Sequence, residues 1–403
     1  MDAVIAILLT QQSDPIQINL LNYFHCSANT ASTSAFVQQR TKLLPSAMKA
    51  IFSHFSEAID PHKCFKGYRL LAVDGTTLPI PYNPNDESTL HRRSTNQKSN
   101  NELLITALFD LESGLYTDSL VQTCKDQHER AALIQLLDNL PDHSMVVIIG
   151  DRGFEGYNVL AHLQEKGIFF LIRAKDTESN GIVSGLDLPD EDEFDFHVNL
   201  SLFRKHNRVT EELARNKNHY KFISHSTDFD FLPSSSSASD PLVTYQLSFR
   251  VVRFRLPDSD NYETIITNLD AVKFPPDLIK EMYHRRWGIE TSFRQLKYII
   301  GLLRLHSKKV ENIMQEIYAS LTMFNYTAAI AQSVLVIKEH TKYKYHVNFA
   351  SAAYLAVRFF LGNIAPPELL DLLSHRILPI RPGRKNPRNK SSGRRMSFNY
   401  VIP

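Results

Sequence analysis

The sequence predicts an α/β protein in which a mixed sheet is flanked by helices and interrupted by a β-rich insertion. Between about residues 68 and 175, apolar runs of strand length alternate with amphipathic stretches of helix length. A short turn joins two of the early runs, whereas helix-length segments separate the later ones. Antiparallel strands should therefore come first and parallel strands follow. Helical patterns precede this region and return at the end of the chain, so we expect helical N- and C-terminal parts.

Composition and charge allow a globular protein of two or three domains. The chain has 403 residues, of which 43% are hydrophobic and 22% are charged. The net charge of +2 conceals an uneven distribution, because six acids fall within 187–195. Residues 280–309 contain eight lysines and arginines but only two acids. Residues 376–395 contain eight lysines and arginines and no acid. These basic stretches are candidate contacts for a polyanion, although a solvated surface has the same composition.

The cysteines and the hydropathy pattern indicate a cytoplasmic protein without a membrane partner. Cys26, Cys64 and Cys124 show no paired spacing, which favours a reducing compartment. The sequence contains no apolar run long enough to span a bilayer. The opening MDAVIAILLTQQSD lacks the cationic start of a signal peptide, so we interpret it as a short buried helix.

The elements before residue 176 follow from local patterns. Residues 1–62 show helical spacing of apolar positions, broken at Pro45, and fit either helical packing or DNA binding. The turn at 112–114 predicts a hairpin, and Gly167 should end a helix. The predicted order of elements is β, β, β, α, β, α and β. Their segments are, in the same order, RLLAVDGTTLPIP, NELLITALFD, LYTDSLVQT, ERAALIQLLDNL, HSMVVIIGDRGF, GYNVLAHLQEKG and IFFLIRAK.

That order is typical of a ribonuclease-H-like sheet. In such a sheet the first and fourth strands are neighbours, and their carboxyl ends lie where open α/β sheets carry their sites. We therefore expect Asp74 and Asp151, each at a strand end, to lie side by side. Taken alone, an Asp before Gly also fits ordinary turn chemistry.

The rest of the chain is expected to contain the insertion, a long helix and a basic tail. Residues 176–262 combine strand-like runs with the low-complexity segment PSSSSASDP at 233–241. PPDLIKEMYHRRWGIETSFRQLKYIIGLLRL should form one long helix, followed by helices near 310–337 and 347–360 and a tail that is disordered when free. The expected domains are 1–64 (small, helical), 65–175 (core, first part), 176–262 (β-rich insertion), 263–335 (core, second part) and 336–403 (C-terminal helices and basic tail).

Four polar residues share one face of the long helix. Tyr283, Arg286, Glu290 and Lys297 have offsets of 0, 3, 7 and 14, and about 100° per residue places them within about 60° of each other. An acid flanked by two cations and a phenol would be unusual in a protein core. Such a group of side chains does suit the binding of a divalent metal beside a phosphate backbone. Glu290 could equally form a routine pair with Arg294, one turn further on.

Three carboxylates are candidate metal ligands. Asp74, Asp151 and Glu290 offer the oxygen donors that Mg²⁺ or Mn²⁺ prefers. Such ions support in-line displacement at phosphorus. Arg286 can bind phosphate through two hydrogen bonds, and Lys297 adds a point charge. Tyr283 can donate a hydrogen bond or stack, although it could also be a core aromatic.

These motifs resemble a known family. VDGT, GDRGF and YHRRWGIETSFRQLK are similar to the three blocks of bacterial insertion-sequence DDE transposases, in the group marked by Y-x2-R-x3-E-x6-K (the "IS-four" family). The intervals of 77 residues from Asp74 to Asp151 and 139 from there to Glu290 also resemble that group. The resemblance covers about 65–330. It implies a ribonuclease-H-like fold with a metal-binding triad at these three acids.

The resemblance also implies how the protein meets DNA. Tyr283, Arg286 and Lys297 would contact phosphates near the transposon end, in a homodimer that pairs two ends. Some relatives excise through a hairpin and flip a base onto an aromatic residue near the end of the insertion, where Tyr262 lies. The further candidate DNA contacts are Arg294 and Trp287, and Trp287 is also expected to pack beside the active site.

One feature departs from the family pattern, because only some 65 residues precede the first strand. Relatives often carry a larger end-recognition domain there. The basic tail or the helices after residue 310 could share that role.

The sequence therefore predicts a Mg²⁺-dependent cut-and-paste transposase. It would act on the terminal inverted repeats of its own element and on target double-stranded DNA, and would associate with the nucleoid when bound. The alternatives are a ribonuclease-H-like nuclease without strand transfer and an inactive DNA-binding element protein.

Overall fold

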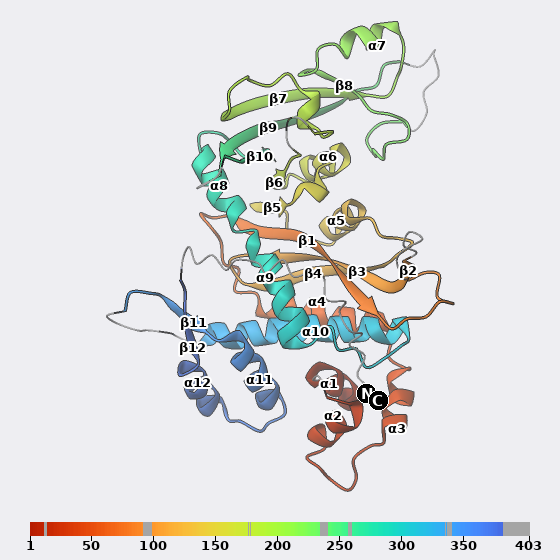
Figure 1. Cartoon of the computed structure of the whole chain (residues 1–403), viewed down its shortest axis with the longest axis vertical. Coiled ribbons are helices and arrows are strands. Elements are labelled where there is room, and N and C mark those ends of the chain that lie inside the picture. The colour runs from red at the N-terminus through yellow and green to blue at the C-terminus, as the bar shows by residue number, and fades with distance from the viewer. Residues whose placement is uncertain are drawn as a thin grey trace.

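The fold is known from a computed structural model that describes residues 1–11, 14–91, 99–175, 177, 179–233, 241–256, 260–334, 336 and 341–381. Its main feature is a large mixed sheet flanked by helices (Figure 1), as the sequence predicts. In the described part of the chain this sheet has ten strands, in the order β2-β3-β1-β5-β6-β10-β9-β7-β8, with β4 paired to β3.

The centre of the sheet contains the strands that the sequence predicts. They are β1 (Arg69–Ile80), β3 (Asn100–Asp110), β4 (Leu115–Thr123), β5 (Val146–Gly150) and β6 (Phe169–Arg173). β1 is antiparallel to β3 and parallel to β5, and β5 is parallel to β6. The predicted change from antiparallel to parallel pairing is therefore confirmed. The hairpin turn lies between β3 and β4, where the sequence places it.

The sheet extends beyond β6 through strands from the second half of the chain. They are β7 (Phe194–Phe203), β8 (Tyr220–Phe222), β9 (Tyr245–Arg255) and β10 (Tyr262–Thr267), with β2 (Leu90–His91) at the opposite edge. β10 is antiparallel to both β6 and β9, so residues 194–255 continue the main sheet. The helical turns η2 (Val183–Gly185) and α7 (Arg208–Leu213) lie between these strands. Most of PSSSSASDP falls outside the described residues.

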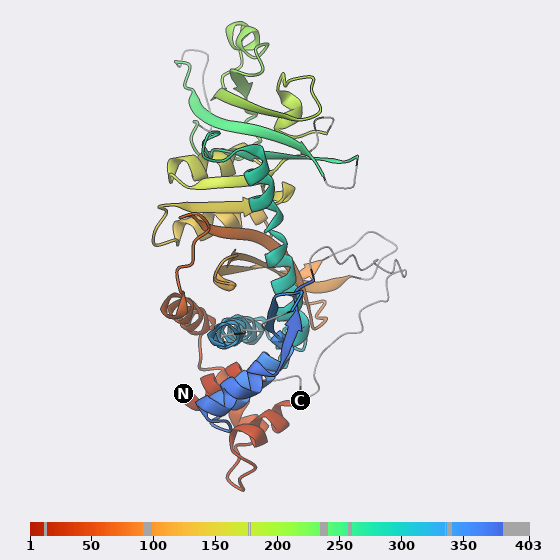
Figure 2. The same ribbon diagram turned by 90° about the vertical axis from the view of Figure 1, so that its left-hand side faces the viewer.

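Successive side chains of the central strands point to opposite faces, and each face is covered. Helices α5 (Glu129–Asp138) and α6 (Tyr157–Glu165) pack on one face, where their apolar residues join Val73 and Ile148 in a single cluster. The opposite face of β1 and β3 packs on α4 (Pro45–Ile59) and α10 (Val310–Ser333). Figure 2 shows α10 end-on beside α4, below the sheet.

The N-terminal helices pack onto α10 and share its core. They are α1 (Asp2–Thr10), α2 (Ile16–Tyr23), α3 (Thr33–Arg40) and α4. The expected break falls at Pro45, which begins α4 because proline is tolerated in a first helical turn. Their apolar residues belong to the same cluster as β1, β3 and α10. The division into five domains stays a prediction.

The prediction of one long helix after residue 275 is wrong. The segment forms α8 (Pro276–His284), α9 (Trp287–Gln295) and a π-helical turn, η3 (Leu296–Ile300), which ends at Gly301. At the first break the amides of Gly288 and Ile289 bond to the carbonyls three residues back. The two central arginines are held by different partners, Arg285 by Glu112 and Arg286 by Glu290. Periodicity does not show such contacts.

The C-terminal part holds more elements than the sequence predicts. Helix α11 (Phe349–Phe360) is as expected, whereas α10 ends at Ser333 instead of near 337. Helix α12 (Pro366–Ser374) and the strand pair β11 (Tyr345–Val347) and β12 (Ile377–Pro379) were not predicted from the sequence. The basic tail from residue 382 lies outside the described residues. No described helix is long and apolar enough to cross a membrane.

Candidate active site

Asp74 and Asp151 lie on adjacent strands, where the parallel pairing stops. The pairing of β1 with β5 ends at Val73 and Gly150. Asp74 and Asp151 are the residues that directly follow these two. Asp74 is not at a strand end, contrary to the prediction, because β1 continues to Ile80 against β3. Only its parallel neighbour ends there, which leaves the Asp74 carboxylate at an open edge.

Each aspartate is held by a backbone amide from a following glycine. The Gly75 amide donates to Asp74 Oδ1 at 2.8 Å, and the Gly153 amide donates to Asp151 Oδ1 at 2.8 Å. The second bond caps the short helix η1 (Arg152–Phe154). Capping is the ordinary structural use of Asp after a strand. In each aspartate, this amide hydrogen bond uses only one of the two carboxylate oxygens.

Glu290 reaches the same site from α9, and Arg286 connects it to Asp74. Arg286 Nη2 donates to Glu290 Oε1 at 2.8 Å, and Arg286 Nη1 lies 4.0 Å from Asp74 Oδ2. The arginine is only 6% exposed, whereas the Glu290 side chain is 36% exposed. A buried guanidinium thus joins the helix to the strand.

Electrostatics place the three acids in one site. Burial raises the pKa of Asp74 to about 7, and the negative charges of Asp151 and Glu290 add to the rise. The hydrogen bond from Gly75 and the charge of Arg286 oppose it. The site therefore has an excess of negative charge, and its oxygen donors come from three separate elements. This donor set fits a hard divalent cation.

A fourth carboxylate, Glu129, lies at this site and was not predicted. A methyl group built on Gly75 would stand 2.2 Å from Glu129 Oε1, and one on Gly153 would stand 3.3 Å from Oε2. Glu129 is the first residue of α5, where an acid is usually explained by the helix dipole. The only hint in the sequence was a glycine close behind each aspartate, since glycine permits close approach.

Tyr283 and Lys297 flank the site and are engaged with the protein. Tyr283 lies on α8, is 4% exposed, and its ring centroid is 5.7 Å from Arg286 Cζ. Burial raises its pKa to about 12. Lys297 Nζ donates to the Thr77 carbonyl at 2.9 Å, and burial lowers its pKa while the charge of Asp74 opposes this. Their contact with DNA stays a prediction.

The remaining candidates lie further out. Trp287 is 50% exposed, with its ring 5.6 Å from Arg286 Cζ, and Arg294 is exposed on α9. Tyr262 begins β10, two strands beyond β5, and Arg253 lies 4.4 Å over its ring. The structure thus brings Trp287 to the site and does not place Tyr262 against the three acids.

The chain is similar to known proteins. A family model described as "Transposase DDE domain" matches residues 65–326. The chain is 22% identical over 370 residues to the transposase InsG for insertion sequence element IS4 of Escherichia coli (strain K12), covering 87% of this chain and 74% of that protein. A cryo-EM structure of the piggyBac transposase synaptic complex with hairpin DNA matches 95% of this chain and 77% of its own, at 11% identity. Its TM-score of 0.43 is too low to establish a common fold.

The fold and the acidic site define an enzyme of phosphoryl transfer on DNA. The chain belongs to the transposase DDE domain family, whose model covers most of it. It is a DDE transposase of the insertion-sequence type, an enzyme that cleaves DNA and transfers its strands. Enzymes of this family act with divalent metal ions.

Proposed function

We propose that the protein is a Mg²⁺-dependent cut-and-paste transposase that acts on the terminal inverted repeats of its own element. The observation that carries this proposal is the convergence of Asp74, Asp151 and Glu290 at one sheet edge, joined by Arg286. The order β4-β3-β1-β5-β6, with two antiparallel and two parallel junctions, supports a ribonuclease-H-like core. Residues 176–262 would then be an insertion that lengthens this sheet.

The three acids would hold the metal, with Mg²⁺ preferred and Mn²⁺ as a substitute. When bound, the cation makes an attacking water or 3′-hydroxyl more acidic and stabilises the leaving oxygen. Asp74 stands on β1 and Asp151 directly follows β5, and each is fixed by an amide hydrogen bond, so their oxygens are positioned in advance. Glu290 is the more exposed of the two acids that contact Arg286, and it would approach the metal from α9.

The basic residues of the site have two expected roles. Arg286 neutralises the acids now and can make bidentate contacts with a phosphate once a cation has taken over that task. Lys297 and the exposed Arg294 would contact phosphates further along the strand, and Trp287 offers an exposed ring beside them. Tyr283, buried under Arg286, would position that arginine in addition to any contact with DNA.

The proposed reaction order is that of the transposases that the sequence resembles. The enzyme would nick the transposon end by hydrolysis, and the freed 3′-hydroxyl would then attack either the opposite strand, forming a hairpin, or target DNA. A homodimer that pairs two ends would present one such site to each. Tyr262 remains the candidate for receiving a flipped base, on strand β10 of the extended sheet.

The test is cleavage of a labelled element end with Mg²⁺, resolving nicked, hairpin and joined products. D74N, D151N and E290Q should each abolish all products while binding of the end persists. The matched control is E368Q, an exposed acid on α12 that should cleave like the parent protein. Activity surviving in all three variants would overturn the proposal. If the protein cleaves the ends but does not join pre-cleaved ends, the result would favour a nuclease. If it only binds the ends, the result would favour an inactive DNA-binding element protein.

A further inference from the structure

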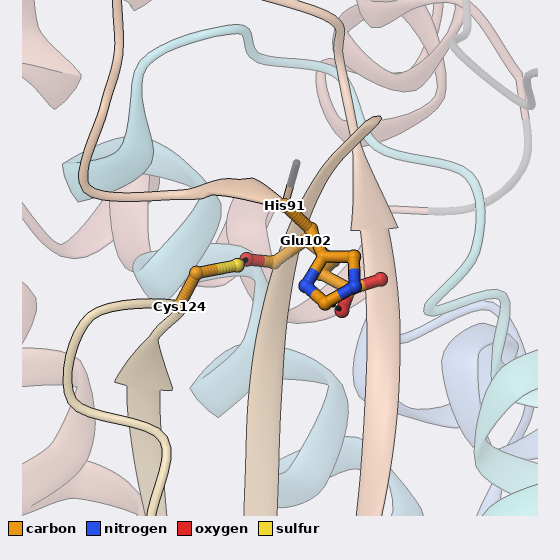
Figure 3. Close-up of side chains that lie close together, drawn as sticks. All are labelled: His91, Glu102 and Cys124. Carbon is orange, nitrogen blue, oxygen red and sulfur yellow. Dashed lines mark hydrogen bonds and ion pairs between the residues drawn. The ribbon is translucent and has the colours of Figure 1, made fainter. Parts of the chain in front are cut away.

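A second cluster of metal-ligating side chains lies away from the three acids. His91 on β2, Glu102 on β3 and Cys124 after β4 bring their ligand atoms within 4.8 Å of one another (Figure 3). His91 Nδ1 is 3.7 Å from Glu102 Oε1. Glu102 pairs with Pro79, five residues beyond Asp74 on β1, which is about 17 Å along the strand. The cluster is therefore separate from the candidate active site.

The strand registers place these side chains together. His91 pairs with Asn100, two residues before Glu102, so both point to the same face of the sheet. Thr123 pairs with Leu103, which brings Cys124 beside Glu102. Cys124 Sγ lies 3.0 Å from the Thr89 carbonyl and 3.5 Å from that of Glu102. Backbone pairing thus fixes the distances among these residues before any ligand binds.

The cluster is polar. Among the described residues, Glu102 forms an ion pair only with His91. Asn100 Nδ2 donates to Glu102 Oε2 at 2.9 Å, while the buried Asn100 Oδ1 has no hydrogen-bond partner in the described part of the chain. A cation at this point would offset the negative charge of Glu102.

We propose that His91, Glu102 and Cys124 bind a divalent transition metal of the zinc type. One imidazole nitrogen, one carboxylate oxygen and one thiolate are ligands that zinc accepts, with a fourth position left for water. Binding displaces the thiol proton to solvent. Ligand atoms in a tetrahedral zinc site lie about 3.5 Å apart, so the 47%-exposed His91 side chain needs to move by about 1 Å. The ion would clamp the two-residue strand β2 to β3 and β4.

The test uses Co²⁺ as the probe, since a thiolate bound to Co²⁺ gives a charge-transfer band in the near ultraviolet. The starting protein is the full chain with C26S and C64S, because both other cysteines are exposed and Cys124 then remains alone. We expect one equivalent of Co²⁺ to produce the band, and zinc to displace it. Adding C124A should abolish it, whereas D74N should leave it unchanged.

Two further variants complete this test. H91A and E102Q should each weaken Co²⁺ binding by about 10-fold or more, with unchanged circular dichroism. The proposal is overturned if the starting protein gives no thiolate band, if the band survives C124A, or if neither ligand variant alters the affinity.

A different observation supports a second inference, which rests on the proposed function. Gly75 and Gly153 follow the two aspartates closely, and neither has a left-handed backbone that would require glycine. A Cβ on Gly75 would stand 2.2 Å from Glu129 Oε1, and one on Gly153 would stand 2.9 Å from Asp151 Oδ1 and 3.3 Å from Glu129 Oε2, so a side chain at either position would displace a carboxylate. The two glycines therefore make room for a fourth acid beside the predicted metal ligands.

We infer that Glu129 is a positioning residue for the metal held by Asp74, Asp151 and Glu290. Its carboxylate would accept hydrogen bonds from waters on that cation, or bind it directly beside Asp151. The measurement is Mn²⁺ binding by calorimetry on the DNA-free protein, with E129Q as the variant. The matched control is D277N, an acid in the first turn of α8.

E129Q should weaken Mn²⁺ binding by about 10-fold and raise the metal concentration needed for cleavage, while D277N behaves like the parent. E129D should retain part of the affinity, which a purely structural role would not predict. If D74N loses binding and E129Q does not, this inference fails and the proposed function stands. If D74N also binds Mn²⁺ normally, the proposed function itself fails.

Discussion

At the residue scale, Arg286 is the cation that connects two of the three acids, Asp74 and Glu290. It is almost fully buried and holds Glu290 and Asp74 through different nitrogens. A lysine has the same charge, but a single ammonium group cannot reach both carboxylates in this fixed fork. The residue therefore acts through its shape as well as its charge.

R286K should lower the rate of end cleavage by about 10²-fold, the usual effect of losing a positioned donor at a reaction centre. The measurement is single-turnover cleavage at saturating Mg²⁺. R285K is the neighbouring control, because Arg285 pairs with Glu112 and Glu281 outside the site. Equal rates for R286K and the parent protein would show that only the charge matters.

The crowding between Gly75 and Glu129 gives a second prediction at this scale. G75A should destabilise the protein by about 1–3 kcal/mol, because the new methyl group collides with Glu129 Oε1. Adding E129A should restore most of the loss, because it removes the colliding group. Urea unfolding of both single variants and the double variant measures the coupling. Additive effects would show that the collision is not the cause.

At the element scale, the break in the signature helix decides where each polar residue points. The expected stripe assumed one α-helix, but Tyr283 lies on α8, Glu290 on α9 and Lys297 in a π-helical turn. The wider turn ends at Gly301, whose φ is +101°. This backbone favours glycine, since a side chain there clashes with its own carbonyl.

G301A should therefore cost about 1–3 kcal/mol in the free energy of unfolding. The variant should also reduce cleavage, because the turn carries Lys297 to the Thr77 carbonyl. G167A is a comparison at another left-handed glycine, which follows helix α6 and has open space around it. A loss of stability in both variants with loss of cleavage only in G301A would support this role of the turn.

A buried ionic cluster ties the N-terminal helices to α10. Arg40 Nη2, on α3, lies 2.9 Å from Glu316 Oε1, on α10. Glu316 Oε2 also accepts a hydrogen bond from the His306 amide at 2.8 Å. Burial alone would raise the pKa of Glu316, but hydrogen bonding to His306 and the charge of Arg40 outweigh it and lower the pKa. The ionised form thus stabilises the fold above the unfolded pKa, and this contribution is lost as the pH falls through the folded pKa.

E316Q should reduce the free energy of unfolding by about 3–5 kcal/mol at neutral pH, because Arg40 loses its buried partner. Its stability should also fall less steeply than that of the parent below the ordinary glutamate pKa of 4.5. Thermal unfolding across that pH range measures both effects. E311Q, which changes an exposed acid on the same helix, should match the parent. If the stability of E316Q fell with acidification as steeply as that of the parent, Glu316 would not be the group responsible.

At the scale of the whole molecule, the sheet separates two sets of accessory elements. Strands β7–β9 lie at one end, and helices α1–α3, α11 and α12 lie at the other (Figures 1 and 2). The signature helices α8 and α9 run between them along the sheet. A DNA duplex at the three acids would therefore have protein surface on both sides, and the basic tail is an additional candidate contact.

Truncation after residue 381 removes six lysines and arginines from the chain. If the tail contacts phosphates, the slope of log K against log salt for end binding should become shallower by up to about five. Cleavage of short ends at low salt should persist, because the three acids are retained. Binding measured over a salt series provides the test, and an unchanged slope would remove the tail from the DNA interface.

Local patterns determined the fold class and the change from antiparallel to parallel pairing, and they nominated the three candidate acids. Strand and helix periods follow from the residues themselves, and the parallel order requires neighbouring strand ends. Only the tertiary structure decided the rest. The break between α8 and α9 falls at Arg285 and Arg286, inside a stretch whose apolar spacing predicts one helix. The places of Glu129 and of the cluster at His91 depend on packing and register between segments far apart in sequence, which no local pattern contains.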